Sequence, residues 1–205
     1  MSLRAIIFDF GGVLVRTRSQ ALRSCWEQRL GLAPGEASEI VFGGESGIAA
    51  QHGHITDETH WGWIARRLDL APAELAAFRR DFFAEDILDT ALLAYVDRLR
   101  LAGYHLGLLS NMADNARTLF GDKYGVLSHF DSVTISSEVG IMKPDPAIFE
   151  IALARAGVAP AEAVFIDDFV ANVEGARRAG LLGIHFRDTS QVVAQLAVLT
   201  NITPK

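Results

Sequence analysis

The chain has 205 residues, of which 50% are hydrophobic and 21% charged, and its formal net charge is −6. This length suits one α/β domain with a modest insertion, or two small domains. The acidic balance and the absence of a long Lys/Arg run argue against a nucleic-acid or anionic-membrane partner, because both need a positive footprint.

The cysteine count and the length of the apolar runs indicate the cellular compartment and whether the chain spans a membrane. Cys25 is the only cysteine, which excludes an internal disulfide and fits a reducing compartment. No uncharged apolar run approaches the ~20 residues of a membrane span. Asp9 interrupts the N-terminal apolar stretch, which is therefore not a signal peptide. We expect a cytoplasmic protein without a membrane partner, and the sequence leaves its oligomeric state open.

The first predicted element is a strand over residues 5–8, an apolar run typical of a buried parallel strand. Gly11 and Gly12 follow it closely and allow a sharp turn. Helices are then predicted over residues 19–30, 34–42, 46–51, 56–68 and 72–83. No comparable strand signal occurs between Val15 and Tyr104. We therefore expect a small all-helical cap over residues 16–86, inserted into a core of residues 1–15 and 87–205.

From Asp89 onward, helices and strands alternate. A stripe of Leu92, Val96 and Leu99 predicts a helix that ends at Gly103. Strands are predicted over residues 104–109, 132–136, 164–166 and 183–186, and helices over residues 114–123, 146–156, 172–179 and 190–199. Such alternation requires a parallel sheet with helices on both faces. The expected fold class is α/β, with a Rossmann-like, doubly wound core.

Reactive polar residues follow apolar runs at several places in the chain. Asp9 follows the first strand, Ser110-Asn111 follows residues 106–109, and Asp167-Asp168 follows residues 163–166. Lys143 stands in the loop Lys143-Pro144-Asp145-Pro146. Because ligands bind beyond the carboxyl ends of parallel strands, we expect these residues to share one edge of the sheet.

Taken together and in this order, the segments FDFGGVL, LLSN, KPDP and FIDD resemble the four motifs of the haloacid dehalogenase-like hydrolase superfamily. The nearest likeness is to the small phosphatases that include the N-terminal domain of soluble epoxide hydrolase and the bacterial sugar-1-phosphatases. The resemblance covers nearly the whole chain except the segment from about Arg16 to Asp86. It implies a Mg²⁺-dependent phosphomonoester hydrolase that acts on a small phosphorylated metabolite through an aspartyl-phosphate.

The resemblance also implies a nucleophile and a metal site. Asp9 would be the nucleophile, which splits one difficult hydrolysis into two easier steps. Mg²⁺ would be bound by Asp9, by the backbone carbonyl of Gly11 and by Asp168, with Asp167 and Asn172 holding its waters. A hard cation that keeps several waters and takes one or two carboxylates is typical of Mg²⁺.

The same resemblance implies the residues that bind the phosphoryl group. Ser110 and Asn111, with backbone N–H groups at the start of the following helix, would grip its oxygens. Lys143 would neutralise charge on both the nucleophile and the phosphoryl group.

Gly11 departs from the family pattern, because most phosphatases of this superfamily carry a second Asp two residues after the nucleophile. General acid–base help is typically worth 10²–10⁴ in rate, or about 3–5 kcal/mol. Its loss leaves open a phosphate-binding regulatory protein without useful turnover. A 2-haloacid dehalogenase also lacks the second Asp, but its pattern has a bulky aromatic residue in place of Gly11 and lacks the paired carboxylates. Phosphoryl transfer to a sugar hydroxyl is a further alternative.

Three histidines and two arginines within and beside the expected cap are further candidates for a site. His52, His54 and His60 suggest a metal site, but no Cys or clear carboxylate pattern accompanies them, so surface or pocket-facing imidazoles are favoured. Arg16 and Arg18 could reach a charge on the substrate, but solvated side chains are the favoured interpretation.

Overall fold

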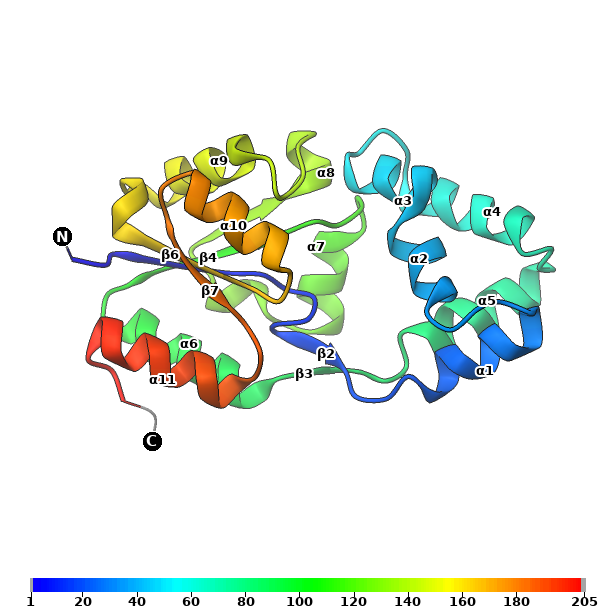
Figure 1. Cartoon of the computed structure of the whole chain (residues 1–205), viewed down its shortest axis with the longest axis horizontal. Coiled ribbons are helices and arrows are strands. Elements are labelled where there is room, and N and C mark those ends of the chain that lie inside the picture. The colour runs from blue at the N-terminus through cyan, green and yellow to red at the C-terminus, as the bar shows by residue number, and fades with distance from the viewer. Residues whose placement is uncertain (1, 204–205) are drawn as a thin grey trace.

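A central parallel sheet organises the computed structural model, which describes residues 2–203. Its five strands lie in the order β5-β4-β1-β6-β7 (Figure 1). They are β1 (Ala5–Phe8), β4 (His105–Ser110), β5 (Ser132–Ile135), β6 (Ala163–Asp167) and β7 (Leu182–His185). The predicted α/β fold class is confirmed. Within the described residues no helix has the length and apolar character needed to cross a membrane.

The central strand β1 is buried on both faces of this sheet. Phe8 lies opposite Leu108 of β4 and Ile166 of β6. Ile6 and Phe8 belong to the hydrophobic cluster formed with α6 (Thr90–Leu101) and α11 (Thr189–Thr200). Ala5 and Ile7 pack with α9 (Pro146–Ala156) and α10 (Val170–Arg178) on the other face (Figure 1). Because both faces are covered, the strand is a continuous apolar run without polar alternation.

Helix α9 begins directly after the segment that carries Lys143. Asp145 is its N-cap and accepts a hydrogen bond from the main-chain N–H of Ala147 at 2.9 Å, and Pro146 occupies the first turn. Both are favourable features of a helix start. The local sequence therefore fixes where the helix starts and leaves Lys143 in the loop at the edge of the sheet.

Five helices between β1 and α6 lie to one side of the sheet in Figure 1. They are α1 (Ala21–Leu30), α2 (Glu36–Phe42), α3 (Gly44–Gln51), α4 (Asp57–Arg67) and α5 (Pro72–Phe82). We call them the helical segment. It has its own cluster of buried side chains: Trp26, Ala37, Ile40, Val41, Trp61, Ile64, Phe78 and Phe82.

Two short strands connect the helical segment to the sheet, in a part of the chain where the sequence has no strand signal and predicts an all-helical cap. β2 (Val15–Thr17) and β3 (Asp86–Leu88) pair antiparallel, with Val15 opposite Leu88 and Thr17 opposite Asp86. Three residues are too few to show a strand period, and the two partners are far apart in the chain. The pairing therefore leaves no local signal in the sequence.

The helix predicted over residues 114–123 is also partly wrong. This stretch forms a short helix α7 (Ala116–Thr118) that continues into a π-helical turn at Leu119–Lys123. Phe120 of that turn is fully buried, and its ring centroid lies 4.2 Å from that of Phe10. A further short helix, α8 (Ser136–Val139), was not predicted at all.

Arg23 joins the helical segment to both connecting strands. Its guanidinium donates to the carbonyl of Phe82 at 2.9 Å, to the Thr17 hydroxyl at 3.0 Å and to Asp86 at 3.1 Å. The side chain is 9% exposed and also lies over the Phe82 ring. Removing one partner of a buried ion pair is costly because the other charge stays buried.

We expect Arg23→Met to lower the free energy of unfolding by about 3 kcal/mol, at the low end for buried pairs because Asp86 keeps some exposure. The matched control is Arg18→Met, which breaks the exposed Arg18–Glu85 pair and should cost less than about 1 kcal/mol. Urea unfolding of both variants measures the difference. Equal losses in the two variants would show that Arg23 does not hold the connection.

Candidate active site

The carboxyl ends of β1, β4 and β6 meet at the edge of the sheet that faces the helical segment (Figure 1). Asp9 follows β1, Ser110 is the last residue of β4, and Asp167 is the last residue of β6. Lys143 enters from the loop before α9. The strand order thus brings into one place residues that are more than 150 positions apart in the sequence.

Lys143 lies at the centre of this group, with its side chain 1% exposed. Its ammonium nitrogen lies 2.8 Å from Asp9 Oδ1 and 2.7 Å from Asp167 Oδ2, and it donates to the carbonyl of Leu109 at 3.1 Å. Burial alone would lower the pKa of Lys143, but the negative charges of Asp9 and Asp167 outweigh it and raise the pKa above its usual value. The lysine is therefore a fixed positive charge with all three donors used.

Asp9 is buried beside this ammonium. One carboxylate oxygen, Oδ1, also accepts a hydrogen bond from the main-chain N–H of Phe10 at 2.7 Å. Burial raises the pKa of Asp9 to about 7 even though the charge of Lys143 lowers it. One lysine therefore does not keep this carboxyl fully ionised at neutral pH, and a further positive charge nearby would do so.

Asp167 and Asp168 are adjacent in the chain but differ in their partners. Asp167 accepts from Lys143, from the Asn172 side-chain amide at 3.0 and 3.1 Å, and from the main-chain N–H of Phe169 at 2.7 Å. Asp168 Oδ1 is buried without any hydrogen-bond partner. Burial and the charge of Asp167 raise the pKa of Asp168. Asp167 is thus held by protein donors, whereas Asp168 has an oxygen available.

Oxygens of Asp9, Asp167 and Asp168 lie within 4.8 Å of one another. In residues 2–203 this is the one group of three or more His, Cys, Asp or Glu residues arranged to hold an ion. Three carboxylates against one lysine leave an excess of negative charge, which a hard divalent cation would neutralise through oxygen ligands. The orphaned oxygen of Asp168 fits such an ion.

Gly11 and Gly12, in the turn after Asp9, have different surroundings. Gly12 has φ +77°, and a Cβ atom there would lie 2.2 Å from Asp168 Oδ2. Gly11 lies outside the left-handed region, and an added Cβ would meet no atom within 4 Å. The chain therefore requires glycine at Gly12 for the close approach of Asp168, but has room for a side chain at Gly11.

Ser110 and Asn111 lie at the same edge. Ser110 is buried. The Asn111 side chain bonds to the main chain of Lys143, because its Nδ2 donates to the Lys143 carbonyl at 2.9 Å and its Oδ1 accepts from the Lys143 N–H at 2.9 Å. No short-range pattern in the sequence indicated this pair, since its members are 32 residues apart.

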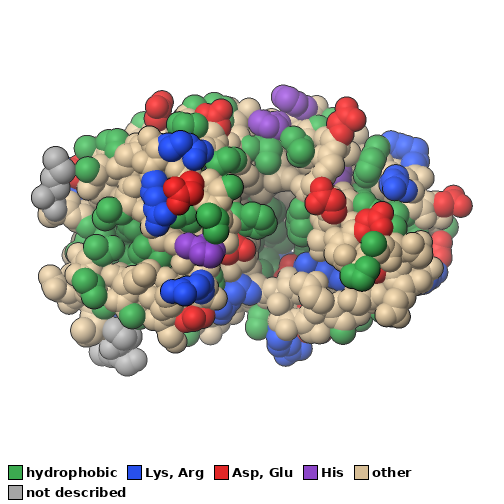
Figure 2. Space-filling view, in the orientation of Figure 1, with side chains coloured by type: hydrophobic (Ala, Val, Ile, Leu, Met, Phe, Trp, Pro, Cys, Tyr) green, Lys and Arg blue, Asp and Glu red, His purple; other side chains and the backbone are tan. Residues whose placement is uncertain are grey.

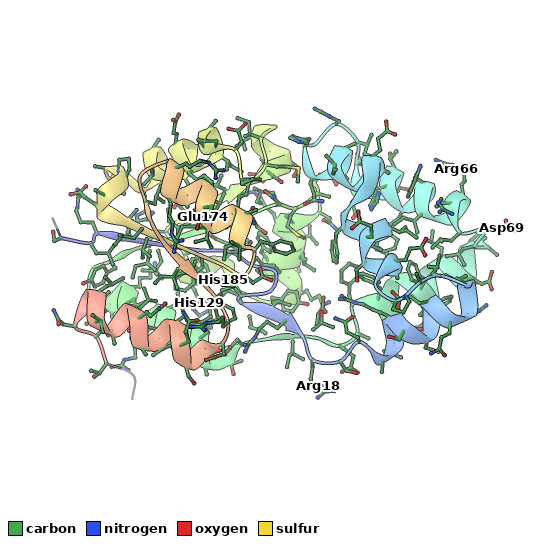
Figure 3. All side chains as sticks on the ribbon, viewed as in Figure 1. Arg18, Arg66, Asp69, His129, Glu174 and His185 are labelled. Atoms are coloured by element: carbon green, nitrogen blue, oxygen red, sulfur yellow. The ribbon has the colours of Figure 1, made fainter. Side chains whose placement is uncertain are left out.

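His185 is a neighbour of the site that sequence analysis missed. It is the last residue of β7, and its Nε2 lies 3.0 Å from the main-chain oxygen of Asp168. Figure 3 shows it on the core, between α10 and α11. A lone His at the end of a four-residue strand gives no signal of such a position in the sequence.

The histidines of the helical segment do not join the site. His60 is buried, with its ring nitrogens 2.9 Å from the Ser46 hydroxyl and 2.9 Å from the Val41 carbonyl, so the expectation of a surface or pocket-facing ring is wrong for it. His52 and His54 stack on each other, and His52 Nδ1 lies 3.1 Å from the Gly140 carbonyl oxygen. These contacts are structural.

The two arginines at the connecting strands also have protein partners. Arg16 forms an ion pair with Asp89 and lies 3.3 Å from the hydroxyl of Thr189. Arg18 forms an exposed pair with Glu85. The expected solvated position fits Arg18 better than the half-buried Arg16.

A hollow lies between the sheet and the helical segment in Figure 2. Away from β2 and β3, hydrogen bonds cross from one part to the other. The Ser136 hydroxyl donates to the Gln51 carbonyl at 2.6 Å, and Asp114 Oδ1 accepts from the Asp57 main-chain N–H at 2.8 Å. The helical segment therefore contacts the core both at its connection and next to α8.

The family model for a haloacid dehalogenase-like hydrolase matches residues 3–180. The chain belongs to this family and is a hydrolase. It is 30% identical to mouse acyl-CoA dehydrogenase family member 10 over 90% of this chain and 18% of that protein. It is 29% identical to pig bifunctional epoxide hydrolase 2 over 98% of this chain and 40% of that protein. The chain thus spans less than half the length of either relative.

A relative of similar length is the glyceraldehyde 3-phosphate phosphatase of Methanopyrus kandleri, 26% identical over 90% of this chain and 84% of that protein. Among solved structures, a predicted HAD-like family hydrolase from Porphyromonas gingivalis matches with a TM-score of 0.75 and 25% identity, over 96% of this chain and 98% of that chain. A HAD family enzyme from Bacteroides thetaiotaomicron, in complex with magnesium and inorganic phosphate, matches with a TM-score of 0.75 and 21% identity. The match covers 93% of this chain and 99% of that chain. The last match concerns the fold alone.

The two glycines of the turn give a matched test of the site geometry. Gly12→Ala should cost about 1–2 kcal/mol of stability for its left-handed backbone, and it should also displace Asp168 and weaken Mg²⁺ binding. Gly11→Ala should change stability by less than about 0.5 kcal/mol. Urea unfolding and calorimetric Mg²⁺ titration measure the two effects. Indistinguishable Mg²⁺ affinities for the two variants would contradict the close packing of Gly12 on Asp168.

Proposed function

We propose that the protein is a Mg²⁺-dependent phosphomonoester hydrolase that acts on a small phosphorylated metabolite through an aspartyl-phosphate at Asp9. The observation that carries this proposal is the buried ammonium of Lys143 between Asp9 and Asp167, beside the unpartnered oxygen of Asp168. The phosphatase named among the relatives and the magnesium and phosphate complex among the structural neighbours support it.

The reaction is difficult because an anionic nucleophile must approach an anionic ester, and the positive charge of Lys143 reduces this repulsion. In the first step an Asp9 oxygen attacks phosphorus and the ester P–O bond breaks, and the leaving oxygen departs as an anion or takes a proton from water. In the second step water attacks the aspartyl-phosphate, releasing phosphate and restoring the carboxylate. Lys143 holds positive charge at Asp9 through both steps, where it stabilises the charge that develops on the phosphoryl oxygens.

We further propose how the remaining residues take part. Asp9, Asp168 and the main-chain carbonyl of Gly11 would hold Mg²⁺, with Asp167 acting through water and through Lys143. The bound ion would supply charge neutralisation at the phosphoryl group. The Ser110 hydroxyl and the main-chain N–H of Asn111 would bind the phosphoryl oxygens, because they lie at the carboxyl end of β4 next to Asp9.

Residues 16–86 would act as a cap over a core of residues 1–15 and 87–205. The separate hydrophobic cluster of the helical segment and the hollow in Figure 2 support this division. The connection through β2 and β3 lies close to both proposed boundaries. The proposed cap also contacts the core at α8, through the hydrogen bond from Ser136 to Gln51.

Gly11 favours a second candidate function, a phosphate-binding regulatory protein with little turnover, because no carboxylic acid stands where a proton donor would help. Dehalogenation is disfavoured by the three clustered acids, since uncharged carbon–halogen bonds offer nothing that requires a cation. Phosphomonoester hydrolysis remains the better proposal, because the loss of a general acid lowers the rate by about 10²–10⁴ and does not abolish catalysis.

The nucleophile is tested by Asp9→Asn, which keeps nearly the same volume and removes the attacking charge. Hydrolysis of an aryl phosphate with saturating Mg²⁺ should fall to background while the unfolding midpoint shows that the fold is intact. The regulatory alternative predicts negligible turnover in the natural protein as well. Substantial turnover in the Asp9→Asn variant would rule out the aspartyl-phosphate.

The missing acid at Gly11 predicts a dependence on the leaving group. Turnover should rise steeply with leaving-group acidity, so that acyl, aryl and anomeric phosphates react faster than alkyl phosphates of similar size. Gly11→Asp should flatten this dependence, because the position has room for a side chain and an ordinary backbone conformation. The measurement is a series of esters of graded leaving-group pKa. A flat series for the natural protein would mean that another residue donates the proton.

A further inference from the structure

Asn111 directly follows the last residue of β4, at the edge of the sheet where we propose that phosphate binds, but its side chain contacts Lys143. We infer that this side chain is a positioning residue that holds Lys143 in place, and that it is not a phosphate ligand. The inference rests on the proposed function, because it assigns the catalytic effect of Asn111 to the lysine.

The hydrogen bonds between the two residues are reciprocal. Asn111 Oδ1 accepts from the Lys143 N–H and Asn111 Nδ2 donates to the Lys143 carbonyl, each at 2.9 Å. Exchanging the oxygen and nitrogen of the amide would place donor against donor and acceptor against acceptor, so only one orientation is compatible with both bonds. The amide thereby pairs with the main chain of Lys143 as a neighbouring strand would.

This pairing matters because Lys143 lies in a loop outside the sheet, between α8 and α9. Its ammonium must nevertheless meet oxygens of Asp9, Leu109 and Asp167 at 2.7 to 3.1 Å. Asn111 holds the main-chain end of the lysine, and Leu109, two residues earlier in the chain, accepts from its side-chain end. The end of β4 therefore holds Lys143 at both ends.

The hydrogen-bond capacity of the amide limits any direct role. One N–H of Nδ2 is used on the Lys143 carbonyl, and Oδ1 is an acceptor that would repel an anionic oxygen. One N–H remains, and direct donation to phosphate through it is the alternative that an experiment must separate from positioning.

A double-mutant cycle with Lys143 separates the two roles. Asn111→Ala should lower kcat/KM for an aryl phosphate by about 10- to 100-fold, as is typical when a partner that orients a site residue is removed. In the Lys143→Ala background the same change should have no further effect, because the residue it positions is gone. The inference would be overturned if Asn111→Ala lowered kcat/KM equally with and without Lys143, or if it caused no loss in the protein that keeps Lys143.

The dissociation constant of inorganic phosphate with saturating Mg²⁺ gives a second readout for the same four proteins, and it stays measurable if Lys143→Ala has no turnover. The non-additive pattern should recur there. Ser110→Ala is the matched control, because the loss of a direct phosphate contact should weaken phosphate binding whether or not Lys143 is present. Asn111→Asp, which keeps the acceptor but sets an oxygen against the Lys143 carbonyl, should reproduce the loss if Asn111→Ala folds poorly.

The cycle also distinguishes this inference from the proposed function. If Lys143→Ala keeps the wild-type kcat/KM, the proposed catalytic role of Lys143 fails and the inference with it. If Lys143→Ala is impaired and Asn111→Ala adds its full effect to it, only the inference fails.

Discussion

The buried ammonium of Lys143 is the contact on which the site depends. A charge taken out of water costs several kcal/mol unless it is well paired, so a lysine with a 1% exposed side chain requires its two carboxylates and one carbonyl. These oxygens come from residues on or next to three neighbouring strands, β1, β4 and β6. The lysine therefore ties the strand ends together, and the charge of the site is inseparable from the order of the sheet.

The three aspartates are not equivalent around that ammonium. Asp167 is held by Lys143, Asn172 and the N–H of Phe169, while Asp168 keeps a buried oxygen without a partner. Asp9 lies between these extremes, with one oxygen paired and a pKa raised to about 7 by burial. The unpaired oxygens are the ones that we propose for the metal. Gly12 completes the arrangement, since any side chain there would occupy the space of Asp168.

The sequence predicted the sheet and the grouping of its strand-end residues because both follow from short-range patterns. Apolar runs of four to six residues mark buried strands, and the parallel connection then places their ends at one edge. The β2–β3 pair gave no such signal, because each strand has three residues and its partner lies about seventy positions away in the chain. The burial of His60 is likewise not predictable from local sequence. A buried histidine is recognised only from the Ser46 and Val41 groups that satisfy it. The Asn111 pair with Lys143 likewise depends on tertiary structure, and a motif that contains Asn111 says nothing of what its side chain contacts.

One lysine is not enough to keep the buried Asp9 carboxyl ionised, and we propose that a divalent cation completes the site. The most direct measurement is the pKa of the Asp9 carboxyl, followed by ¹³C NMR with Asp9→Asn used to assign the signal. Without a divalent cation the pKa should lie near 7, and saturating Mg²⁺ should lower it well below that value. A pKa close to the ordinary value of 3.8 without the cation, or one that Mg²⁺ leaves unchanged, would contradict the account.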